Sequence, residues 1–427
     1  MTNTVATSTS ASILLATGDH LYVSRDTEVI VPDAVGIDGA TGTSNGVSIA
    51  VDGTVVSLAD VAIRLRAASE TGDNVLVVGA SGILRAVSPA AVGAISAVGS
   101  DTVIQNWGEI TGTRAVYLYG CDDSRIENHG SMAGQDQTGV LISFSEAVEV
   151  INTGSISGRL GVEFSFASGR IENSGEIIAT DAGGTAIRAY TADGSVVVVN
   201  TGHISSASSA FYGGAHDDRL VNGGSIYGTV NLGDGEDTYR GARGVIDGTV
   251  YGGLGDDVLH GGAGEEVFEG EDGGDDMLGR GGDDVLSGGN GVDTIGGGAG
   301  DDVVSGGNGG DTIRGATGDD VLSGEAGADV LNGGKDDDTL TGGGGADVFV
   351  FNRNAGFDVI TDFENGVDRI DLSAFGIRAA DYASIVAPAI SNAGGAVVID
   401  LAALGGQGSI LVEGLGINQA DSSDFIL

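Results

Sequence analysis

Three nine-residue stretches decide the fold of this 427-residue chain: GGLGDDVLH at residues 252–260, GGNGVDTIG at residues 288–296 and GGNGGDTIR at residues 306–314. They share the pattern G-G-x-G-x-D-x-U-x, in which U is a large apolar residue. Eleven such units follow one another without insertion from Gly252 to Val350. Six residues of each unit predict a tight turn, and three predict a short strand whose U side chain points inward. Two units then complete one coil, so residues 18 positions apart stack on the same side.

The acidic residues at position 6 of the units should therefore form two columns, one along each edge of the coil. One column holds Asp257, Asp275, Asp293, Asp311, Asp329 and Asp347, and the other holds Glu266, Asp284, Asp302, Asp320 and Asp338. Glycines at positions 1, 2 and 4 permit positive φ and are expected to bring backbone carbonyls close to a common point. The position-4 glycines proposed to serve the site are Gly255, Gly282, Gly291, Gly300, Gly309, Gly318 and Gly327.

A column of carboxylates repels itself unless a cation lies between adjacent turns. Two carboxylates and several carbonyls suit Ca²⁺, whereas Mg²⁺ demands a stricter octahedron and zinc or copper would require His or Cys. We expect roughly nine ions, about one between each like-sided pair of turns. Three departures should weaken particular sites: Glu266 replaces Asp, Glu271 replaces the second glycine and Asp336 replaces the fourth.

The composition agrees with a folded polyanion that binds cations. The chain has 79 glycines, and 18 Lys or Arg oppose 61 Asp or Glu, for a net charge of −43. This charge excludes sequence-independent nucleic-acid binding and attraction to anionic membranes. A hydrophobic content of 41% argues against disorder, and no stretch reaches the 18 apolar residues of a membrane-spanning helix. The lone Cys121 cannot form an intramolecular disulfide.

A second repeat precedes the first, from about residue 100 to 228. An Asn-x-Gly phrase recurs with asparagines 22, 24, 21, 27 and 22 residues apart: Asn106, Asn128, Asn152, Asn173, Asn200 and Asn222. Short apolar segments such as 115–118 and 139–142 lie between these phrases, which predicts two or three strands per unit. Stacked units form a parallel β-solenoid, with the asparagines as a buried structural ladder at a corner. A sugar-binding stripe is the alternative interpretation of these asparagines.

The expected fold is all-β: a parallel β-solenoid (β-helix) continuing into a parallel β-roll, with a small β-rich C-terminal cap. We expect an N-terminal cap at 1–45, the solenoid at 46–230, the β-roll at 231–350 and the C-terminal cap with an export signal at 351–427. Degenerate nonapeptides at 213–221 and 232–240 place the second repeat directly after the first. One continuous rod is therefore expected.

The nonapeptide resembles the calcium-binding repeat of RTX (repeats-in-toxin) exoproteins. The segments 346–351, 358–363 and 366–373 resemble the C-terminal region of serralysin-type proteins, and the asparagine coils resemble autotransporter passenger domains. The resemblance implies secretion by a type I system, with Asp424, Phe425, Ile426 and Leu427 as an uncleaved signal. The first twenty residues carry no Lys or Arg and do not resemble a cleavable leader. An extracellular or cell-surface location is expected.

Catalytic motifs are mostly missing from the sequence. It contains neither H-E-x-x-H nor G-x-S-x-G, and its five histidines are scattered. The cluster at 216–219 reads His-Asp-Asp-Arg, but its alignment with the nonapeptide favours a degenerate turn. Cys121 has no adjacent histidine to activate it and is expected at a half-buried corner. Five arginines (Arg114, Arg125, Arg159, Arg170 and Arg188) could line a groove for an acidic polysaccharide or occupy a polar face, and the polar face is favoured.

These observations predict a non-enzymatic, calcium-binding surface-layer, matrix or adhesin protein. Its expected partners are calcium, the type I secretion machinery, and either copies of itself or a cell-surface glycan. A polysaccharide lyase or epimerase that uses a groove of the solenoid is the alternative function.

Overall fold

The computed structural model describes residues 13–14, 20–25, 27–31, 37–38, 47–58, 60–66, 74–88, 91–191, 193–241 and 243–427. Most of the expected N-terminal cap, residues 1–45, lies outside the described residues. The chain forms two compact units. The first contains the chain up to Asp234 together with Gly244–Gly248, and the second contains Gly235–Arg243 and Thr249–Leu427. The expected domain boundaries and the continuous rod stay predictions.

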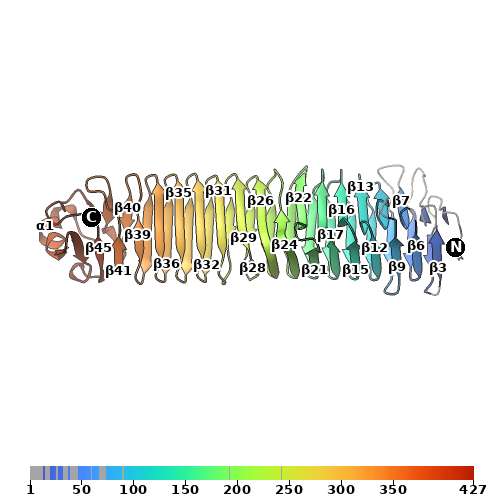
Figure 1. Cartoon of the computed structure of the whole chain (residues 1–427). Coiled ribbons are helices and arrows are strands. Elements are labelled where there is room, and N and C mark those ends of the chain that lie inside the picture. Colours follow the sequence, from blue (N-terminus) through green and yellow to red (C-terminus); the bar gives the residue numbers. More distant parts are fainter. Residues whose placement is uncertain are drawn as a thin grey trace. The chain divides into compact units, whose positions relative to one another are not determined.

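The first unit is a parallel β-solenoid with three strands in most coils (Figure 1). Its first face contains β2 (His20–Val23), β5 (Ser48–Val51), β8 (Val75–Val78), β11 (Val103–Asn106), β14 (Arg125–Asn128), β17 (Val148–Asn152), β20 (Gly169–Asn173), β23 (Val196–Asn200) and β25 (Arg219–Asn222). The second face contains β3 (Glu28–Val31), β6 (Thr54–Ser57), β9 (Ile83–Ala86), β12 (Glu109–Gly112), β15 (Ser131–Gly134), β18 (Ser155–Gly158), β21 (Glu176–Ala179), the first parts of β24 (His203–Tyr212) and β26 (Ser225–Asp234), and β28 (Val245–Asp247). The third face contains β1 (Ile13–Leu14), β4 (Ile37–Asp38), β7 (Ile63–Arg66), β10 (Ile95–Val98), β13 (Val116–Tyr119), β16 (Thr138–Ser143), β19 (Leu160–Ser165), β22 (Thr185–Thr191) and the later parts of β24 and β26.

Alternation of buried and exposed residues sets the register of these strands. Ile104 on β11 pairs with Ile126 on β14, and both are fully buried. Each inward position therefore stacks on the equivalent position of the next coil, and a shift of one residue would expose every core side chain. The early coils expected from Val47–Val51 and Val75–Val78 are present as β5 and β8, which pair with each other in parallel.

The asparagine ladder is confirmed at the corner between the first and second faces. Each amide Nδ2 donates to the Oδ1 of the next asparagine, at 2.7–2.9 Å from Asn106 through to Asn222. All six side chains are buried, so their amides offer no exposed stripe to a sugar. The accompanying glycines are required by space, because a Cβ on Gly154 would lie 2.1 Å from the carbonyl oxygen of Gly130.

The second unit is a parallel solenoid with two strands per coil. One series contains β27 (Thr238–Arg240), β30 (Val258–His260), β32 (Asp276–Gly281), β34 (Thr294–Ala299), β36 (Thr312–Thr317), β38 (Val330–Lys335), β40 (Val348–Val350), β42 (Arg369–Asp371) and β46 (Phe425–Ile426). The other contains β29 (Thr249–Leu254), β31 (Val267–Asp272), β33 (Val285–Asn290), β35 (Val303–Asn308), β37 (Val321–Ala326), β39 (Thr339–Thr341), β41 (Asn354–Ile360) and β45 (Gln407–Val412). The U residues form its core: Leu286 on β33 pairs with Val304 on β35, and both are buried.

The strands of this unit are longer than the sequence predicts. β33 covers positions 7–9 of one nonapeptide and positions 1–3 of the next, which makes six residues instead of the three expected. Most neighbouring strands of the second unit also have six residues. Backbone pairing continues through the glycines, with Gly289 opposite Glu271 and Asn290 opposite Asp272. The turn is accordingly shorter than expected and contains positions 4–6.

The last part of the chain combines parallel and antiparallel strands. β43 (Ile390–Ala393) and β44 (Ala396–Asp400) form an antiparallel pair, and β44 then pairs with β45. The helical segments of this region are η1 (Ser373–Phe375), η2 (Ala379–Asp381), α1 (Tyr382–Ile385), η3 (Ala387–Ala389) and η4 (Ala402–Leu404). Within the described ranges, no helix has the length and apolar character needed to cross a membrane.

Candidate metal centre

The position-6 carboxylates form the two expected columns. In the first column, the backbone N–H of each aspartate donates to the Oδ1 of the aspartate in the next coil, at 2.8–3.0 Å. This ladder runs through Asp257, Asp275, Asp293, Asp311, Asp329, Asp347 and Asp368. In the second column the same bond measures 2.7–3.1 Å and links Glu266, Asp284, Asp302, Asp320, Asp338 and Asp358. One oxygen of each accepting carboxylate is thus fixed by the backbone.

The second oxygen of these carboxylates is buried without a hydrogen-bond partner. This holds for Oδ2 of Asp257, Asp275, Asp284, Asp293, Asp302, Asp311, Asp320, Asp329, Asp338, Asp347 and Asp358. Each of these side chains is at most 2% exposed. A buried polar atom without a partner costs on the order of 1–3 kcal/mol, and more when it is charged. Eleven such atoms in two columns require a cation or protons.

The position-1 glycines keep space open beside these oxygens. A Cβ on Gly288 would lie 2.3 Å from Oδ2 of Asp293 and 2.5 Å from the carbonyl oxygen of Gly306 in the next coil. The position-1 glycines do not use the positive φ that glycine permits, because none of them lies in that region. Position 1 requires glycine for space, since a methyl group would fill the place next to the unpartnered oxygen.

Positions 2 and 4 carry the positive φ angles. The position-4 glycines proposed from the sequence have φ between 108° and 154°: Gly255, Gly282, Gly291, Gly300, Gly309, Gly318 and Gly327. The departures from glycine keep the same backbone conformation, with φ of 77° at Glu271 and 72° at Asp336. The turn is therefore maintained by its neighbours even where a Cβ disfavours it.

Burial raises the pKa of the column carboxyl groups. It raises the pKa of Asp257 and Asp320 to about 7, of Asp293 to about 6 and of Asp338 to about 8. The like charge of neighbouring acids raises these values further, and the backbone N–H bonds oppose the shift. The ionised columns are thus unfavourable near neutral pH unless a cation compensates them.

The donor set fits calcium. Within the described part of the chain, no group of three or more His, Cys, Asp or Glu side chains is placed to share one ion. A metal here would therefore combine one or two carboxylates with backbone carbonyls. Hard cations that accept six to eight oxygens in a flexible geometry match that set.

Three members of the columns are absent from the predicted ones: Asp237, Asp358 and Asp368. Asp358 and Asp368 accept the N–H groups of Asp338 and Asp347, although they lie 20 and 21 residues further on instead of 18. Their local signal is an acidic residue two positions before a buried isoleucine, without the glycines. Asp237 begins the first column, because its N–H donates to Oδ1 of Asp257 at 2.8 Å.

The other candidate catalytic residues from the sequence, Cys121 and the cluster at 216–219, occupy structural positions. Cys121 is completely rather than half buried, and burial raises its pKa to about 11, which is unsuitable for a nucleophile. In the 216–219 cluster only Asp218 is buried, and it accepts the N–H groups of Val196 and Gly214 at 2.7 and 3.0 Å. The interpretation of this cluster as a degenerate turn agrees with that geometry.

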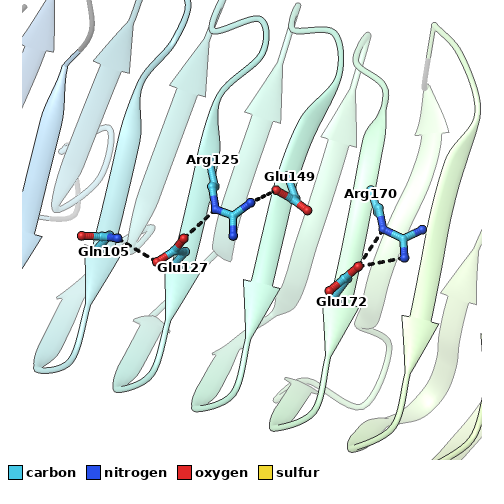
Figure 2. Close-up of polar contacts among 6 residues, drawn as sticks. All are labelled: Gln105, Arg125, Glu127, Glu149, Arg170 and Glu172. Atoms are coloured by element: carbon cyan, nitrogen blue, oxygen red, sulfur yellow. Dashed lines mark hydrogen bonds and ion pairs between the residues drawn. The ribbon is translucent and has the colours of Figure 1, made fainter.

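The five arginines divide between two faces of the first unit. Figure 2 shows Arg125 and Arg170 on the first face, beside glutamates of the same face. Arg125 bridges Glu127 and Glu149, and Arg170 Nη2 lies 2.8 Å from Oε1 of Glu172. These two arginines belong to a polar face, as favoured. Arg114, Arg159 and Arg188 instead line a single groove on the third face.

Comparison with known proteins identifies the nonapeptide segment. Five overlapping segments, 247–277, 269–304, 278–313, 305–340 and 314–349, match the family model of the RTX calcium-binding nonapeptide repeat (4 copies). The chain thus carries calcium-binding RTX repeats within a β-solenoid fold. No curated protein matches it.

Thirty-three chains of solved structures also match. One is the R3 subunit of AlgE6, a mannuronan C5-epimerase from Azotobacter vinelandii, with 30% identity over 30% of this chain and 78% of that chain, and a TM-score of 0.25. Another is the extracellular lipase LipA from Serratia marcescens, with 18% identity over 42% of this chain and a TM-score of 0.19. The match spans 40% of the lipase chain.

Proposed function

We propose that this protein is an extracellular structural or surface protein, of surface-layer, matrix or adhesin type, whose nonapeptide unit folds on binding calcium. The observation that carries the proposal is the set of eleven buried Oδ2 atoms without hydrogen-bond partners, ten of which lie in the RTX repeats. A domain that buries so many unpaired carboxylate oxygens is unstable in the absence of a counter-ion near neutral pH.

Calcium would bind between like-sided turns. The proposed ligands are the position-6 carboxylates, through their unpaired Oδ2 atoms, and carbonyl oxygens of the glycine turns. Roughly nine ions would offset some 18 negative charges and cross-link adjacent coils. Because the ligands converge only in the coiled state, the free energy of calcium binding becomes free energy of folding.

Export before folding is consistent with this dependence on calcium. We propose that residues 424–427 are read by a type I secretion machinery. In the folded state Asp424 is 1% exposed, and Phe425 on β46 pairs with Ile370 on β42. Recognition of these residues would therefore take place on the unfolded chain, in a compartment poor in calcium.

A role in assembly or adhesion follows from the same ion. Calcium can bridge carboxylates of neighbouring molecules as well as those of neighbouring turns. Exposed aspartates at position 5, among them Asp283, Asp301, Asp319 and Asp337, form an outer acidic row suited to such bridges. The partner is proposed to be another copy of this chain or a cell-surface glycan.

A polysaccharide-active enzyme is the alternative, and the groove on the third face favours it over other enzymes. Among the residues that line this groove, however, the only carboxylate is Glu163, which forms an ion pair with Arg188. A lyase or epimerase needs a free base beside the sugar ring. We therefore prefer the non-enzymatic function.

Calcium titration with two readouts tests this proposal. In EGTA, residues 252–350 should exchange their amide hydrogens rapidly, and millimolar calcium should protect them and increase the far-UV β signal. Electron microscopy in calcium should show ordered sheets or filaments that EGTA dissolves. Full amide protection in EGTA would contradict the calcium requirement. Monodisperse particles that cleave alginate or pectin-like polymers would instead favour the enzyme.

A further inference from the structure

The groove on the third face of the first unit has an unusual composition for this chain. Its volume is about 330 Å³, and its lining residues come from four successive coils. Leu141 on β16, Glu163 on β19 and Arg188 on β22 lie in register across its floor. Gln137, Thr138, Ser143, Ser165 and Thr185 add amide and hydroxyl groups to the lining. A polar groove of this kind matches a hydroxyl-rich ligand.

Three guanidinium groups concentrate positive charge in this groove. Its lining contains Arg114, Arg159 and Arg188 and the carboxylate of Glu163, and Asp181, outside the lining, has its Oδ2 3.9 Å from Nε of Arg159. The whole chain has a net charge of −43, so a local excess of arginine is a marked departure from the rest of the molecule. Guanidinium forks bind carboxylates with two parallel hydrogen bonds, which suits an acidic ligand.

Arg114 uses only part of its hydrogen-bonding capacity within the protein. Its Nη1 donates to the carbonyl oxygen of Val92 at 3.2 Å, and its guanidinium carbon lies 5.9 Å from the centroid of the Tyr117 ring. Its Nε is buried without a hydrogen-bond partner. Glu163, by contrast, accepts from Thr138 Oγ1 at 3.2 Å and pairs with Arg188, so its carboxylate is held in place. The Nη groups of Arg114, and not its buried Nε, are therefore the donors that a bound acid could use.

A column of exposed aromatic rings borders the groove at the ends of its strands. The centroids of Tyr119 and Phe144 are 5.3 Å apart, and those of Phe144 and Phe166 are 5.1 Å apart with nearly parallel rings. The three side chains are 44–53% exposed. Phe144 and Phe166 directly follow the lining residues Ser143 and Ser165, so the column and the groove form one surface.

The backbone of this column is strained. Phe144 and Phe166 have φ of 51° and 50°, a region that is unfavourable for a residue with a Cβ. The equivalent residue of the preceding coil is Gly120, with φ of 57°, so glycine fits this corner. Exposed phenylalanines in place of glycine contribute little to the core. Their strain and exposure together point to a ligand.

We infer that this surface binds an oligosaccharide that carries carboxylate groups, that is, a uronic-acid oligomer. The exposed ring edges of the aromatic column offer an apolar strip to the C–H groups of sugar rings, the hydroxyl and amide groups bind sugar hydroxyls, and Arg114 and Arg159 bind the carboxylate. The inference names a site and a ligand class for the surface glycan of the proposed function and rests on that function for its biological setting. Binding itself requires only the first unit.

Isothermal titration calorimetry of the full chain with short probes tests the inference. The probes are hexamers of galacturonate, mannuronate and glucuronate, with the methyl-esterified galacturonate hexamer as the uncharged match. Short oligomers are appropriate because the net charge of the chain repels a long polyanion. At one fixed calcium concentration, at least one acid hexamer should bind, and an esterified match to the best binder should bind at least about tenfold more weakly.

Matched variants assign the binding to the groove. Arg114→Gln should weaken binding about tenfold, whereas Arg170→Gln, which removes an arginine from the first face, should leave it unchanged. Phe144→Asn removes a ring but tolerates positive φ, and should weaken binding severalfold. Each of three results would overturn the inference: wild-type binding by both Arg114→Gln and Phe144→Asn, equal binding of the acid and its ester, or no binding of any hexamer. Calcium-dependent protection of residues 252–350 would be unaffected by that failure, so the two proposals are separable.

Discussion

At the scale of the residue, the two oxygens of each column aspartate have different tasks. In Asp302, Oδ1 accepts the N–H of Asp284 at 2.9 Å, whereas Oδ2 is buried without a partner. The backbone bond orients the side chain, and the free oxygen creates the demand for a cation. The adjacent Asp301 is exposed and accepts the N–H of Asp319, so it carries the same charge in water.

This difference predicts that Asp302→Asn has opposite effects with and without calcium. Asparagine keeps the Oδ1 acceptor but removes a buried charge whose pKa burial raises. In EGTA the second unit should therefore be more stable than wild type, because the cost of burying that charge is removed. In calcium the Asp302→Asn variant should bind fewer ions than wild type and should need a severalfold higher calcium concentration to fold, because a charged ligand is lost.

Calcium titrations followed by circular dichroism and calorimetry measure both effects. Asp301→Asn is the control, because it removes the same charge one residue away and should leave the number of ions bound between the turns of one molecule unchanged. Equal behaviour of the two variants would show that net charge, and not the buried oxygen, governs calcium binding.

At the scale of the element, the coils of the second unit respond to protons as well as calcium. Burial raises the pKa of Glu266 and Asp358 to about 7, and of Asp338 to about 8, above the values of the unfolded chain. A carboxyl group with a raised pKa in the folded state binds protons more tightly there, so acid stabilises the fold. The stabilisation is complete below the unfolded pKa, near 4, and is lost as pH rises through about 6–8.

Acid should therefore partly replace calcium. In EGTA, lowering the pH from about 8 to about 5 should increase the β signal and the thermal stability of residues 252–350. Calcium binding should respond to pH in the opposite direction. Protons compete with calcium for the same carboxylate oxygens, so the apparent affinity for calcium should fall as the pH is lowered from about 8 to about 5. Far-UV circular dichroism at several pH values, with and without EGTA, checks both. If the calcium-free protein is equally unfolded at both pH values, the buried columns do not control its folding.

The regularity of an element decides how much of it the sequence predicts. The strict nine-residue period places Asp293 above Asp275 without any structural information, and the structure has that pair in one column. The period fails beyond Asp347, where insertions place Asp358 and Asp368 in register only through their backbone pairing. In the first unit, spacings of 21–27 residues predict an asparagine ladder but not which arginines share a face.

Local conformation sets a second limit on prediction from the sequence. Nothing in the sequence around Phe144 and Phe166 indicates positive φ, a conformation that bulky residues rarely adopt. The stacked aromatic column therefore becomes visible only once the coil geometry is known. The six-residue length of the strands in the second unit is hidden from the sequence for a similar reason. Glycine has a low strand propensity, but pairing between adjacent coils extends the strands through the glycines.

At the scale of the whole molecule, the two units are stabilised by different chemistry. In the first, the ladder from Asn106 to Asn222 pairs buried amides with one another, and the buried carboxylate of Asp218 accepts two backbone N–H groups. In the second, the eleven Oδ2 atoms of the column aspartates are buried without hydrogen-bond partners. Only the second unit should therefore depend on calcium.

Limited proteolysis with chymotrypsin should separate the two units by their calcium requirement. In EGTA at neutral pH, cleavage should begin at apolar residues of the nonapeptides, such as Leu259 and Phe268, which are buried only when the coils form. The asparagine-ladder coils should survive as a fragment, because neither their core nor their ladder uses an ion. In calcium both units should resist cleavage, and mass spectrometry identifies the fragments. Digestion of both units at the same rate in EGTA would mean that the first unit also needs the metal, and that the asparagine ladder and apolar core are insufficient to hold its coils together.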